Sequence, residues 1–346
     1  MTRRNRALLW GSAGLTAGLA INAAIRLRFM LDMRGDVVLI TGGSRGLGLA
    51  LAREFAGLGC RVAICARKQD ELDIAKHDLE RRGAEVFAGV CDISKESEVV
   101  NLIQAVRARF GRIDHLINNA GIIRVAPVAN MTLDDFRYAM DVMFWGVVYP
   151  TLHVLDEMKH RGRGRIANVT SIGGKVSVPH LLPYCCAKFA AVGFSEGLRA
   201  ELARHGVKVI TIAPGLMRTG SYRQAEFKGN HQQEAAWFSI SSSLPLMSMG
   251  AERAARQIVA AVRRGDSEKI LSTQASLLAR ANGAFPGFIP NLMAAANRFL
   301  PHETFDRESI VTGAQAEQHA EDYQRRLTRL GRRAAERLNE MTETRA

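Results

Sequence analysis

Short apolar runs alternate with longer stretches of helical periodicity across the middle of the chain. The apolar runs lie at residues 36–41, 60–66, 84–92, 112–118, 164–171, 207–215 and 268–272. Amphipathic stretches lie at about 47–59, 67–82, 95–110, 132–160, 183–205 and 251–264. Strands that alternate with helices predict a parallel sheet covered by helices on both faces. We therefore predict an α/β fold with a doubly wound parallel sheet over residues 35–273.

The N-terminal segment, residues 1–34, departs from this alternation. Residues 7–25 carry no charge, and a helix of that length spans about 28 Å, close to the thickness of the hydrocarbon core of a bilayer. Arginines lie on both sides of this stretch. We predict a hydrophobic helix that anchors the protein in a membrane. The alternatives are a cleaved signal peptide, with small residues near 22–24, and a soluble or interfacial helix.

The C-terminal segment, residues 274–346, is predicted to be a helical extension with a charged tail. Residues 274–301 mix apolar and small residues with prolines, which indicates short helices on the body or on a membrane surface. Residues 314–346 are highly charged, with an apolar stripe at helical spacing formed by Leu327, Leu330, Ala334 and Leu338. The tail is interpreted either as a solvated amphipathic helix that binds a partner or as a frayed polar end.

Composition narrows the class of protein. A hydrophobic content of 47% with 23% charged residues is typical of a globular protein with a sizeable core. The net charge of +13 is the only feature that favours a nucleic-acid binder, and no nucleic-acid-binding motif accompanies it, so we predict no nucleic-acid partner. The five cysteines have no C-x-x-C spacing, which predicts neither disulfides nor a metal site. We expect a membrane-associated protein whose reduced catalytic domain faces the cytoplasm.

A glycine-rich turn follows the first predicted strand. The stretch "ITGGSRGLG" places Gly42, Gly46 and Gly48 between that strand and a helix. Glycines permit a tight turn and close approach of a ligand to the backbone, and the N-terminus of the following helix favours a pyrophosphate. The turn therefore predicts a dinucleotide-binding site.

The second predicted strand indicates which dinucleotide binds. An acidic residue near its end would bind a ribose 2′-hydroxyl, but Ala66 and then Arg67 stand there. Arg45 lies within the glycine turn itself. Two guanidinium groups near the expected 2′-phosphate favour NADP(H) over NAD(H), against the alternative that both are ordinary surface arginines.

A tyrosine and a lysine form a second candidate site. Tyr184 and Lys188 are four residues apart, so on a helix they share one face. A phenol titrates near ~10 in water, and a neighbouring ammonium favours the phenolate and lowers that pKa. Such a pair can exchange a proton with a carbonyl oxygen. Taken alone, such a pair is more often two exposed helical side chains.

At this point the chain resembles the short-chain dehydrogenases/reductases. The matching motifs, in the family's order, are "TGGSRGLG" at 41–48, "CD" at 91–92, "NNAG" at 118–121, Ser171, "YCCAK" at 184–188 and "PG" at 214–215. The resemblance covers about residues 36–272 and implies a Rossmann-like fold. It also implies an oxidoreductase that interconverts a carbonyl and an alcohol.

The resemblance implies a role for each motif. Tyr184 would be the general acid/base, Lys188 would hold the nicotinamide ribose, and Ser171 would bind the substrate oxygen. Asp92 would contact the adenine side, and Thr219 would reach the pyrophosphate. The full predicted cofactor set is Gly42, Ser44, Arg45, Gly46, Leu47, Gly48, Arg67, Asp92, Ile93, Asn118, Ala120, Gly121, Tyr184, Lys188, Pro214, Gly215 and Thr219.

One position departs from the family's pattern. The family has an asparagine in the helix after "NNAG" that completes a proton relay to the lysine, but Met143 stands at that place in "MDVMFWGVV". A thioether is a weak acceptor and not a donor. Either another polar group or a water replaces the asparagine, or the protein is a nucleotide-binding scaffold with weak or no catalysis.

The loop at 216–249 is expected to cover the substrate. Its apolar residues are Met217, Tyr222, Phe227, Trp237, Phe238, Leu244, Leu246, Met247 and Met249. Packing accounts for many of them, but together with the predicted anchor they favour a hydrophobic substrate of lipid, retinoid or steroid type. A homo-oligomer is expected from the resemblance alone.

Overall fold

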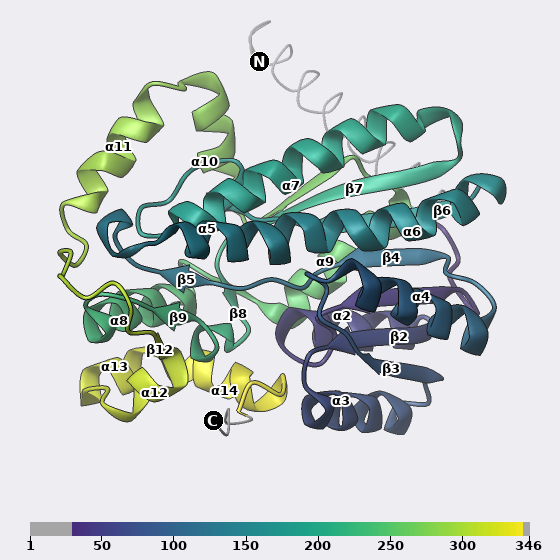
Figure 1. Cartoon of the computed structure of the whole chain (residues 1–346), viewed down its shortest axis with the longest axis horizontal. Coiled ribbons are helices and arrows are strands. Elements are labelled where there is room, and N and C mark those ends of the chain that lie inside the picture. The colour runs from purple at the N-terminus through teal and green to yellow at the C-terminus, as the bar shows by residue number, and fades with distance from the viewer. Residues whose placement is uncertain (1–29, 342–346) are drawn as a thin grey trace, which may run out of the picture.

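A seven-stranded parallel sheet forms the centre of the molecule in a computed structural model that describes residues 30–341 (Figure 1). Its order is β3-β2-β1-β4-β6-β7-β11. The strands are β1 Val37–Thr41, β2 Arg61–Ala66, β3 Val86–Val90, β4 His115–Asn118, β6 Gly164–Val169, β7 Val207–Pro214 and β11 Glu268–Leu271. All seven lie within the apolar runs of the sequence, so the predicted α/β fold is confirmed.

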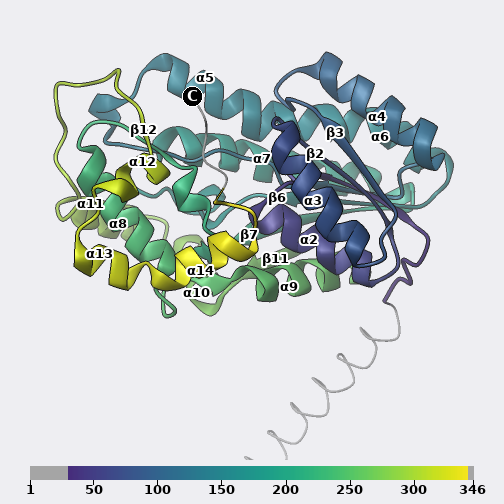
Figure 2. The ribbon, with the colours of Figure 1, turned by 90° about the horizontal axis from the view of Figure 1, so that it is seen from below.

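Helices cover both faces of the sheet, as Figure 2 shows from below. One face carries α2 Gly46–Gly57, α3 Gln69–Arg81 and α9 Ala251–Arg264. The other carries α4 Glu96–Phe110, α5 Leu133–Met140, α6 Gly146–His160 and α7 Leu182–Glu201. The predicted helix over 132–160 is interrupted by one π-helical turn, Asp141–Trp145.

The alternation of side chains along β1 shows how one strand supplies both cores. All five of its residues are buried. Val38 and Ile40 pack in the core with α2 and α9, whereas Val37 and Leu39 pack in the core with α4 and α6. A strand buried on both faces has a continuous apolar sequence, and the run at 36–41 has that pattern.

The strand order reverses direction between β1 and β4, which defines the edge where ligands bind in open α/β sheets. The loops that follow these two strands are tied together there. The Asn119 amide Nδ2 donates to the carbonyl oxygens of Thr41 and Gly42, at 3.0 and 3.1 Å. The backbone N–H groups of Asn119 and Ala120 donate to Thr41 Oγ1.

A smaller lobe stands beside this edge. It contains β5 Arg124–Val125, β9 Glu226–Phe227 and β12 Val311–Thr312 in one sheet, β8 Met217–Arg218 paired with β10 Met249–Gly250, and α8 His231–Ser243. Tyr222, Phe227 and Phe238 are buried in the core of this lobe. Leu246 and Met247 are 86% and 48% exposed. The apolar residues predicted to face the substrate are therefore largely used to build the lobe.

The C-terminal residues form short helices that return to the body. They are α10 Thr273–Ala284, α11 Phe288–Asn297, α12 Gly313–Gln318, α13 Asp322–Leu327 and α14 Arg329–Arg337. Of the predicted apolar stripe, Ala334 and Leu338 are fully buried while Leu327 and Leu330 are 43% and 41% exposed. The tail is therefore helical as one interpretation had it, but its end is neither frayed nor fully solvated, because the Gly46 N–H and Arg53 Nη1 of α2 donate to the carbonyls of Leu338 and Arg337. Binding of a partner by the tail stays a prediction.

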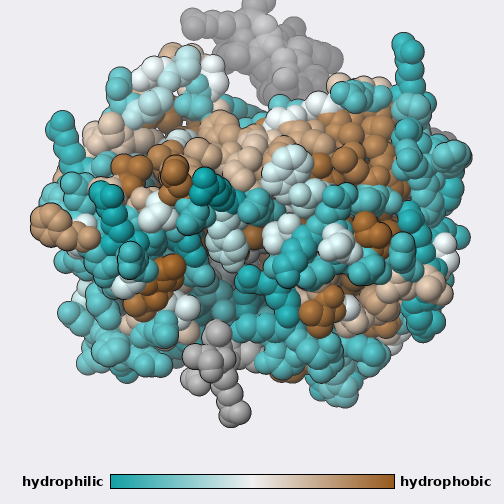
Figure 3. All heavy atoms as spheres, in the orientation of Figure 1, coloured by the Kyte–Doolittle hydropathy of each residue, from teal (hydrophilic) through white to brown (hydrophobic). Residues whose placement is uncertain are grey.

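The predicted membrane anchor at residues 7–25 lies outside the described residues. Within residues 30–341, no helix is both long enough and apolar enough to cross a bilayer. The space-filling view shows apolar side chains gathered over α6 and α7 (Figure 3). Exposed apolar residues of these helices include Leu152 at 51% and Phe189 at 44%.

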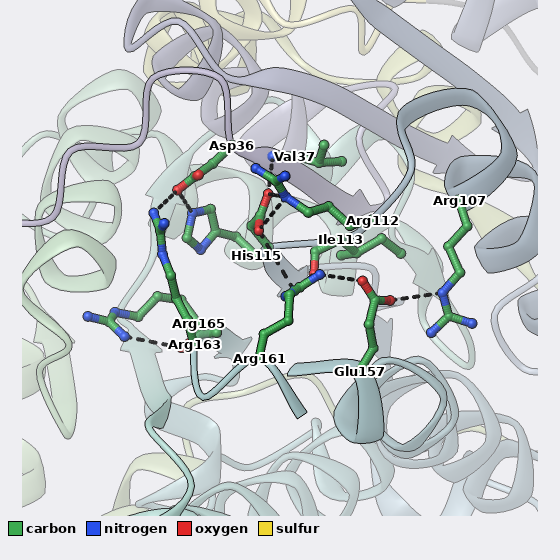
Figure 4. Close-up of polar contacts among 12 residues, drawn as sticks. Asp36, Val37, Arg107, Arg112, Ile113, His115, Glu157, Arg161, Arg163 and Arg165 are labelled. Carbon is green, nitrogen blue, oxygen red and sulfur yellow. Dashed lines mark hydrogen bonds and ion pairs between the residues drawn. The ribbon is translucent and has the colours of Figure 1, made fainter. Parts of the chain in front are cut away.

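A cluster of charged side chains lies at the opposite, amino edge of the sheet (Figure 4). Asp36 Oδ2 lies 2.8 Å from His115 Nε2 and accepts from Arg163 Nη2 at 2.8 Å. The Asp114 carboxylate accepts from the Val37 N–H and from Arg112 Nε, at 2.9 and 3.0 Å. The two edges of the sheet thus carry different chemistry.

Candidate active site

Ser171, Tyr184 and Lys188 come together beside the carboxyl ends of the strands. Ser171 follows β6, and its Oγ accepts the N–H of Gly173 at 3.0 Å. Tyr184 and Lys188 lie in the first turns of α7, which begins beside Pro183, a residue suited to the first turn of a helix. The predicted i, i+4 pair on one helix is confirmed.

The three side chains converge around the Ser171–Gly173 turn. The Tyr184 hydroxyl is close enough to Ser171 for that side chain to act on its pKa. A Cβ atom placed on Gly173 would lie 3.0 Å from Tyr184 Cε1 and 3.4 Å from Ser171 Oγ, so both groups border the same small space. Lys188 Nζ lies 5.8 Å from the centre of the Tyr184 ring and donates to the Val169 carbonyl at 3.0 Å.

Burial moves both proton-exchanging groups toward their neutral forms. It raises the pKa of Tyr184 to about 12, although the hydrogen bond to Ser171 works in the lowering direction. Burial lowers the pKa of Lys188 to about 8. The predicted net lowering of the tyrosine pKa is therefore wrong, because desolvation of the phenolate prevails. The separate contribution of Lys188 stays a prediction.

Met143 faces the lysine, as its position in the sequence predicted. It is 1% exposed and lies in the π-helical turn Asp141–Trp145. A Cβ atom on Gly121 would lie 3.7 Å from both Lys188 Nζ and Met143 Sδ, so both side chains border the same space at Gly121. Such π-helical turns displace backbone hydrogen bonds and are frequent at functional sites.

The glycine turn leads into α2 with the tight geometry that the motif predicts. Gly42 has a positive φ of 64°, and a Cβ atom on it would lie 2.8 Å from Ala120 Cα. A Cβ atom on Gly48 would overlap the Gly42 carbonyl oxygen, so no other residue fits there. Leu47 packs into the core beneath the turn.

An open cleft with about 570 Å³ of empty volume runs from this turn across the ends of β2 and β3. It is lined by Gly42, Ser44, Arg45, Cys65, Ala66, Arg67, Lys68, Glu71, Cys91, Asp92, Ile93, Ala120, Ile122 and Val142. Seven of the predicted cofactor residues are in this list. The sequence analysis missed Lys68 and Glu71; their only signal is their position directly after the end of β2.

Arg45 and Arg67 both line the cleft but have different partners. Arg67 Nη1 donates to the Tyr138 hydroxyl at 3.1 Å. Arg45 Nη1 donates to Glu71 Oε1 at 2.8 Å. Glu71 is 2% exposed, also accepts from Ser44 Oγ, and lies 3.5 Å from Lys68 Nζ. A buried carboxylate therefore holds the cations of the glycine turn in place.

Of the remaining predicted residues, Asp92 lines the cleft, whereas the side chain of Asn118 points away from it. Asp92 Oδ1 accepts from the backbone and hydroxyl of Ser94, which shapes the cleft wall. The Asn118 amide instead donates to Thr151 Oγ1 and Asn168 Oδ1, at 2.9 and 2.8 Å, in a buried network behind the site. Its side chain therefore supports the loop and does not line the cleft.

The last predicted positions follow β7. Pro214 ends this strand, and Gly215 packs beside Ser272 and Ala275. Thr219 is buried, and its Cβ lies 3.8 Å from a Cβ atom placed on Gly46. These residues close the site on the side of the smaller lobe.

Comparison with known proteins identifies relatives of this site. A family model described as short chain dehydrogenase matches residues 36–228. The oxidoreductase SadH of Mycobacterium tuberculosis is 33% identical over 260 residues, covering 74% of this chain and 94% of its own. A protein named as a ketoacyl reductase in Streptomyces coelicolor is 36% identical over 192 residues, covering 55% of this chain and 74% of its own.

Solved structures agree with these sequence matches. A variant of actinorhodin polyketide ketoreductase with NADPH is 30% identical, covers 70% of this chain and 97% of its own, and superposes with a TM-score of 0.62. A short chain dehydrogenase/reductase from Burkholderia phymatum in complex with NAD has the same fold at 22% identity and a TM-score of 0.68, covering 74% of this chain and 95% of its own.

Proposed function

Since this chain belongs to the short-chain dehydrogenase/reductase family, we propose that it is an NADP(H)-dependent oxidoreductase that interconverts a carbonyl and an alcohol. The observation that carries the proposal is the convergence of Ser171, Tyr184 and Lys188 beside a glycine turn at the carboxyl edge of the sheet. A proton donor, an oxygen-binding hydroxyl and a cation there suit the reduction of a carbonyl.

The proposed division of labour follows from the local chemistry. NADPH, when bound, supplies the hydride that reaches the carbonyl carbon. The Tyr184 hydroxyl gives its proton to the carbonyl oxygen, and Ser171 Oγ holds that oxygen beside it. A tyrosine with a pKa of about 12 stays protonated at neutral pH and is a competent donor. Lys188, with a pKa of about 8, is mainly an ammonium at pH 7 and stabilises the phenolate that remains.

The preference for NADP(H) rests on the basic side chains of the cleft. Arg45, Arg67 and Lys68 line it, and Ala66 stands where an acid would favour NAD(H). Glu71 opposes this preference because it already pairs with Arg45. We therefore assign the main contact with the 2′-phosphate to Arg67, which donates its hydrogen bond to a neutral hydroxyl.

The test is a titration of the purified protein with NADPH and NADH, followed by nicotinamide fluorescence. We expect Arg67→Ala to weaken NADPH binding about 10- to 100-fold and NADH binding less than about twofold, as for loss of a charge-assisted hydrogen bond. Arg82→Ala is the matched control, because Arg82 is 51% exposed and pairs with Asp78 outside the cleft. Equal binding of the two cofactors by the unmodified chain would refute the preference.

We also propose a hydrophobic carbonyl as substrate. Support comes from Trp237, which is partly buried and packs on the same apolar cluster of the smaller lobe as Tyr184. Met217, also partly buried, packs on the core beneath the glycine turn. Turnover of medium-chain or polycyclic ketones should exceed that of small sugars. Equal rates on small polar carbonyls would count against a hydrophobic substrate. Membrane association and a homo-oligomer stay predictions from the sequence.

A further inference from the structure

The end of the C-terminal extension lies on the glycine turn, next to α2 (Figures 1 and 2). The Gly46 N–H, the first of α2, donates to the Leu338 carbonyl at 2.8 Å. The Asn339 amide Nδ2 donates to the carbonyl oxygens of Ser44 and Glu71, at 3.0 and 3.1 Å. Residues 338–340, here called the tail plug, are thus bonded to the turn itself.

Glu340 places a carboxylate over the same turn. The residue is 2% exposed, and a Cβ atom on Gly46 would lie 2.6 Å from Glu340 Oε1. The other oxygen, Oε2, has no hydrogen-bond partner within residues 30–341; Arg45 Nε lies 3.5 Å away. A carboxyl group with an unsatisfied oxygen is therefore buried at the positive end of a twelve-residue helix.

The two carboxylate oxygens of Glu340 lie at the N-terminus of α2, where the phosphates of a dinucleotide bind in glycine turns of this kind. Phosphate oxygens accept the first N–H groups of such a helix, and Leu338 already accepts one of them. Thr219, the residue expected to reach the pyrophosphate, lies next to the same Gly46 position. Building on the proposed NADP(H) site, we propose that the tail plug imitates a pyrophosphate and inhibits the enzyme by occupying the glycine turn until NADP(H) displaces it.

After it leaves the glycine turn, the tail plug stays attached to the body of the protein through α14. Ala334 and Ala335 are fully buried, so α14 stays anchored while residues 338–340 move. Asn339 has a positive φ of 57°, which turns the chain sharply onto the glycine turn. Release relieves the buried Glu340 oxygen, and phosphate oxygens can then take over the contacts with the turn.

Proton binding should favour the plugged state. Burial raises the pKa of Glu340 to about 7; Arg45 and Arg223 lower it, and Glu71 raises it. A released glutamate titrates near ~4.3, so the docked carboxyl binds the proton more tightly. Docking is therefore strongest at low pH and weakens as pH rises through about 7. We expect NADPH affinity to rise between pH 6 and pH 8.

The first experiment compares NADPH dissociation constants in full-length variants. Asn339→Ala removes two hydrogen bonds and disfavours the left-handed backbone, so NADPH should bind at least about fivefold more tightly. Asn297→Ala, at an exposed position of α11, is the matched control and should leave affinity unchanged. Unchanged or weaker NADPH binding by Asn339→Ala would overturn the inference. Weaker binding would mean that residues 338–340 hold the cofactor in place and do not compete with it.

A second pair of variants isolates the carboxyl group. Glu340→Gln keeps the size of the side chain without its titration, so the gain in NADPH affinity from pH 6 to pH 8 should shrink. Glu336→Gln, exposed on α14, should behave as the unmodified protein. The comparison is between variants, because the 2′-phosphate itself titrates near pH ~6. Equal pH dependence in all three proteins would show that Glu340 does not respond to proton binding, contrary to the plug.

Hydrogen exchange on the unmodified chain tests the displacement without any mutation. NADPH should slow exchange at residues 42–48 and speed it at residues 338–341. Slower exchange in both segments would overturn the inference while leaving NADP(H) binding intact. If neither the unmodified protein nor Asn339→Ala binds NADPH, the proposed function and the plug both fail.

Discussion

Burial has opposite outcomes for ionisable side chains at the two edges of the sheet. At the amino edge, Asp36 is nearly fully buried, yet its pKa is lowered, because the contacts with His115 and Arg163 outweigh desolvation. At the carboxyl edge, no charged group among residues 30–341 forms an ion pair with Tyr184 or Lys188, so burial raises the pKa of the phenol and lowers that of the ammonium. The same desolvation therefore gives a closed ion pair in one place and a proton-exchanging pair in the other.

The difference lies in whether a charged partner is within hydrogen-bond distance of the buried group. His115 Nε2 and Arg163 Nη2 both contact the same Asp36 oxygen, whereas Lys188 Nζ contacts a neutral carbonyl. Perturbed pKa values without a paired charge are characteristic of functional sites. Paired buried charges instead matter for stability, because removing one partner strands the other. The following substitutions test that contrast.

The largest effect should come from Tyr184→Phe. Turnover of any carbonyl substrate should fall at least about 1000-fold, because the only proposed proton donor is lost. NADPH affinity should stay within about twofold, since the aromatic ring remains. Steady-state kinetics and fluorescence titration provide the two measurements. Tyr149→Phe, a partly buried tyrosine stacked on Trp145, is the control and should keep its turnover. Retained turnover in Tyr184→Phe would remove the tyrosine from the mechanism.

The next effect should appear at the other edge and only in stability. Asp36→Ala strands His115 and Arg163, so the free energy of unfolding should fall by about 3 kcal/mol while turnover per folded molecule is unchanged. Asp134→Ala, whose partner Arg137 is exposed, should cost less than about 1 kcal/mol. Denaturant unfolding measures both.

The pH dependence of this stability has a defined sign. The pKa of Asp36 is lower in the folded chain than in the unfolded one, so its contribution is complete above about pH 4 and is lost as pH falls through the folded value. The loss of stability on acidification should therefore be smaller in Asp36→Ala. An equal loss of stability in both proteins would show that the ion pairs of Asp36 do not stabilise the folded chain.

Part of this contrast could be predicted from the sequence. The strands and the site motifs are local patterns, so the α/β fold and the grouping of Ser171, Tyr184 and Lys188 were available before any coordinates. Burial depends on tertiary packing, which is why the direction of the Tyr184 pKa was predicted wrongly. The contact of Glu340 with Gly46 joins residues almost 300 positions apart and has no local signature. The Asn118 side chain likewise turns to Thr151 for reasons that only the packed loop shows.

A pH profile sharpens the description of the carboxyl edge. Lys188 loses its charge near pH 8, so carbonyl reduction should fall about fivefold between pH 8 and pH 9. Its unfolded pKa is near ~10.4, so over the range from 8 to 10.4 the unfolded chain binds the extra proton and stability should rise with pH. Activity and stability thus move in opposite directions. In Lys188→Met this rise in stability should be absent; its persistence would assign it to another group.

The smallest effect on turnover is expected for Met143→Asn, which restores the residue that the family's pattern has beside the lysine. Turnover should change less than about threefold, because Lys188 Nζ already has an acceptor in the Val169 carbonyl and water can serve as a further one. Stability should fall by about 1–2 kcal/mol, because a buried thioether is replaced by an amide without assured partners. Met140→Asn, at a partly buried position just before the π-helical turn, is the control. A gain in turnover of more than tenfold would show that the proton relay is missing in this chain. It would favour a nucleotide-binding protein with little catalysis.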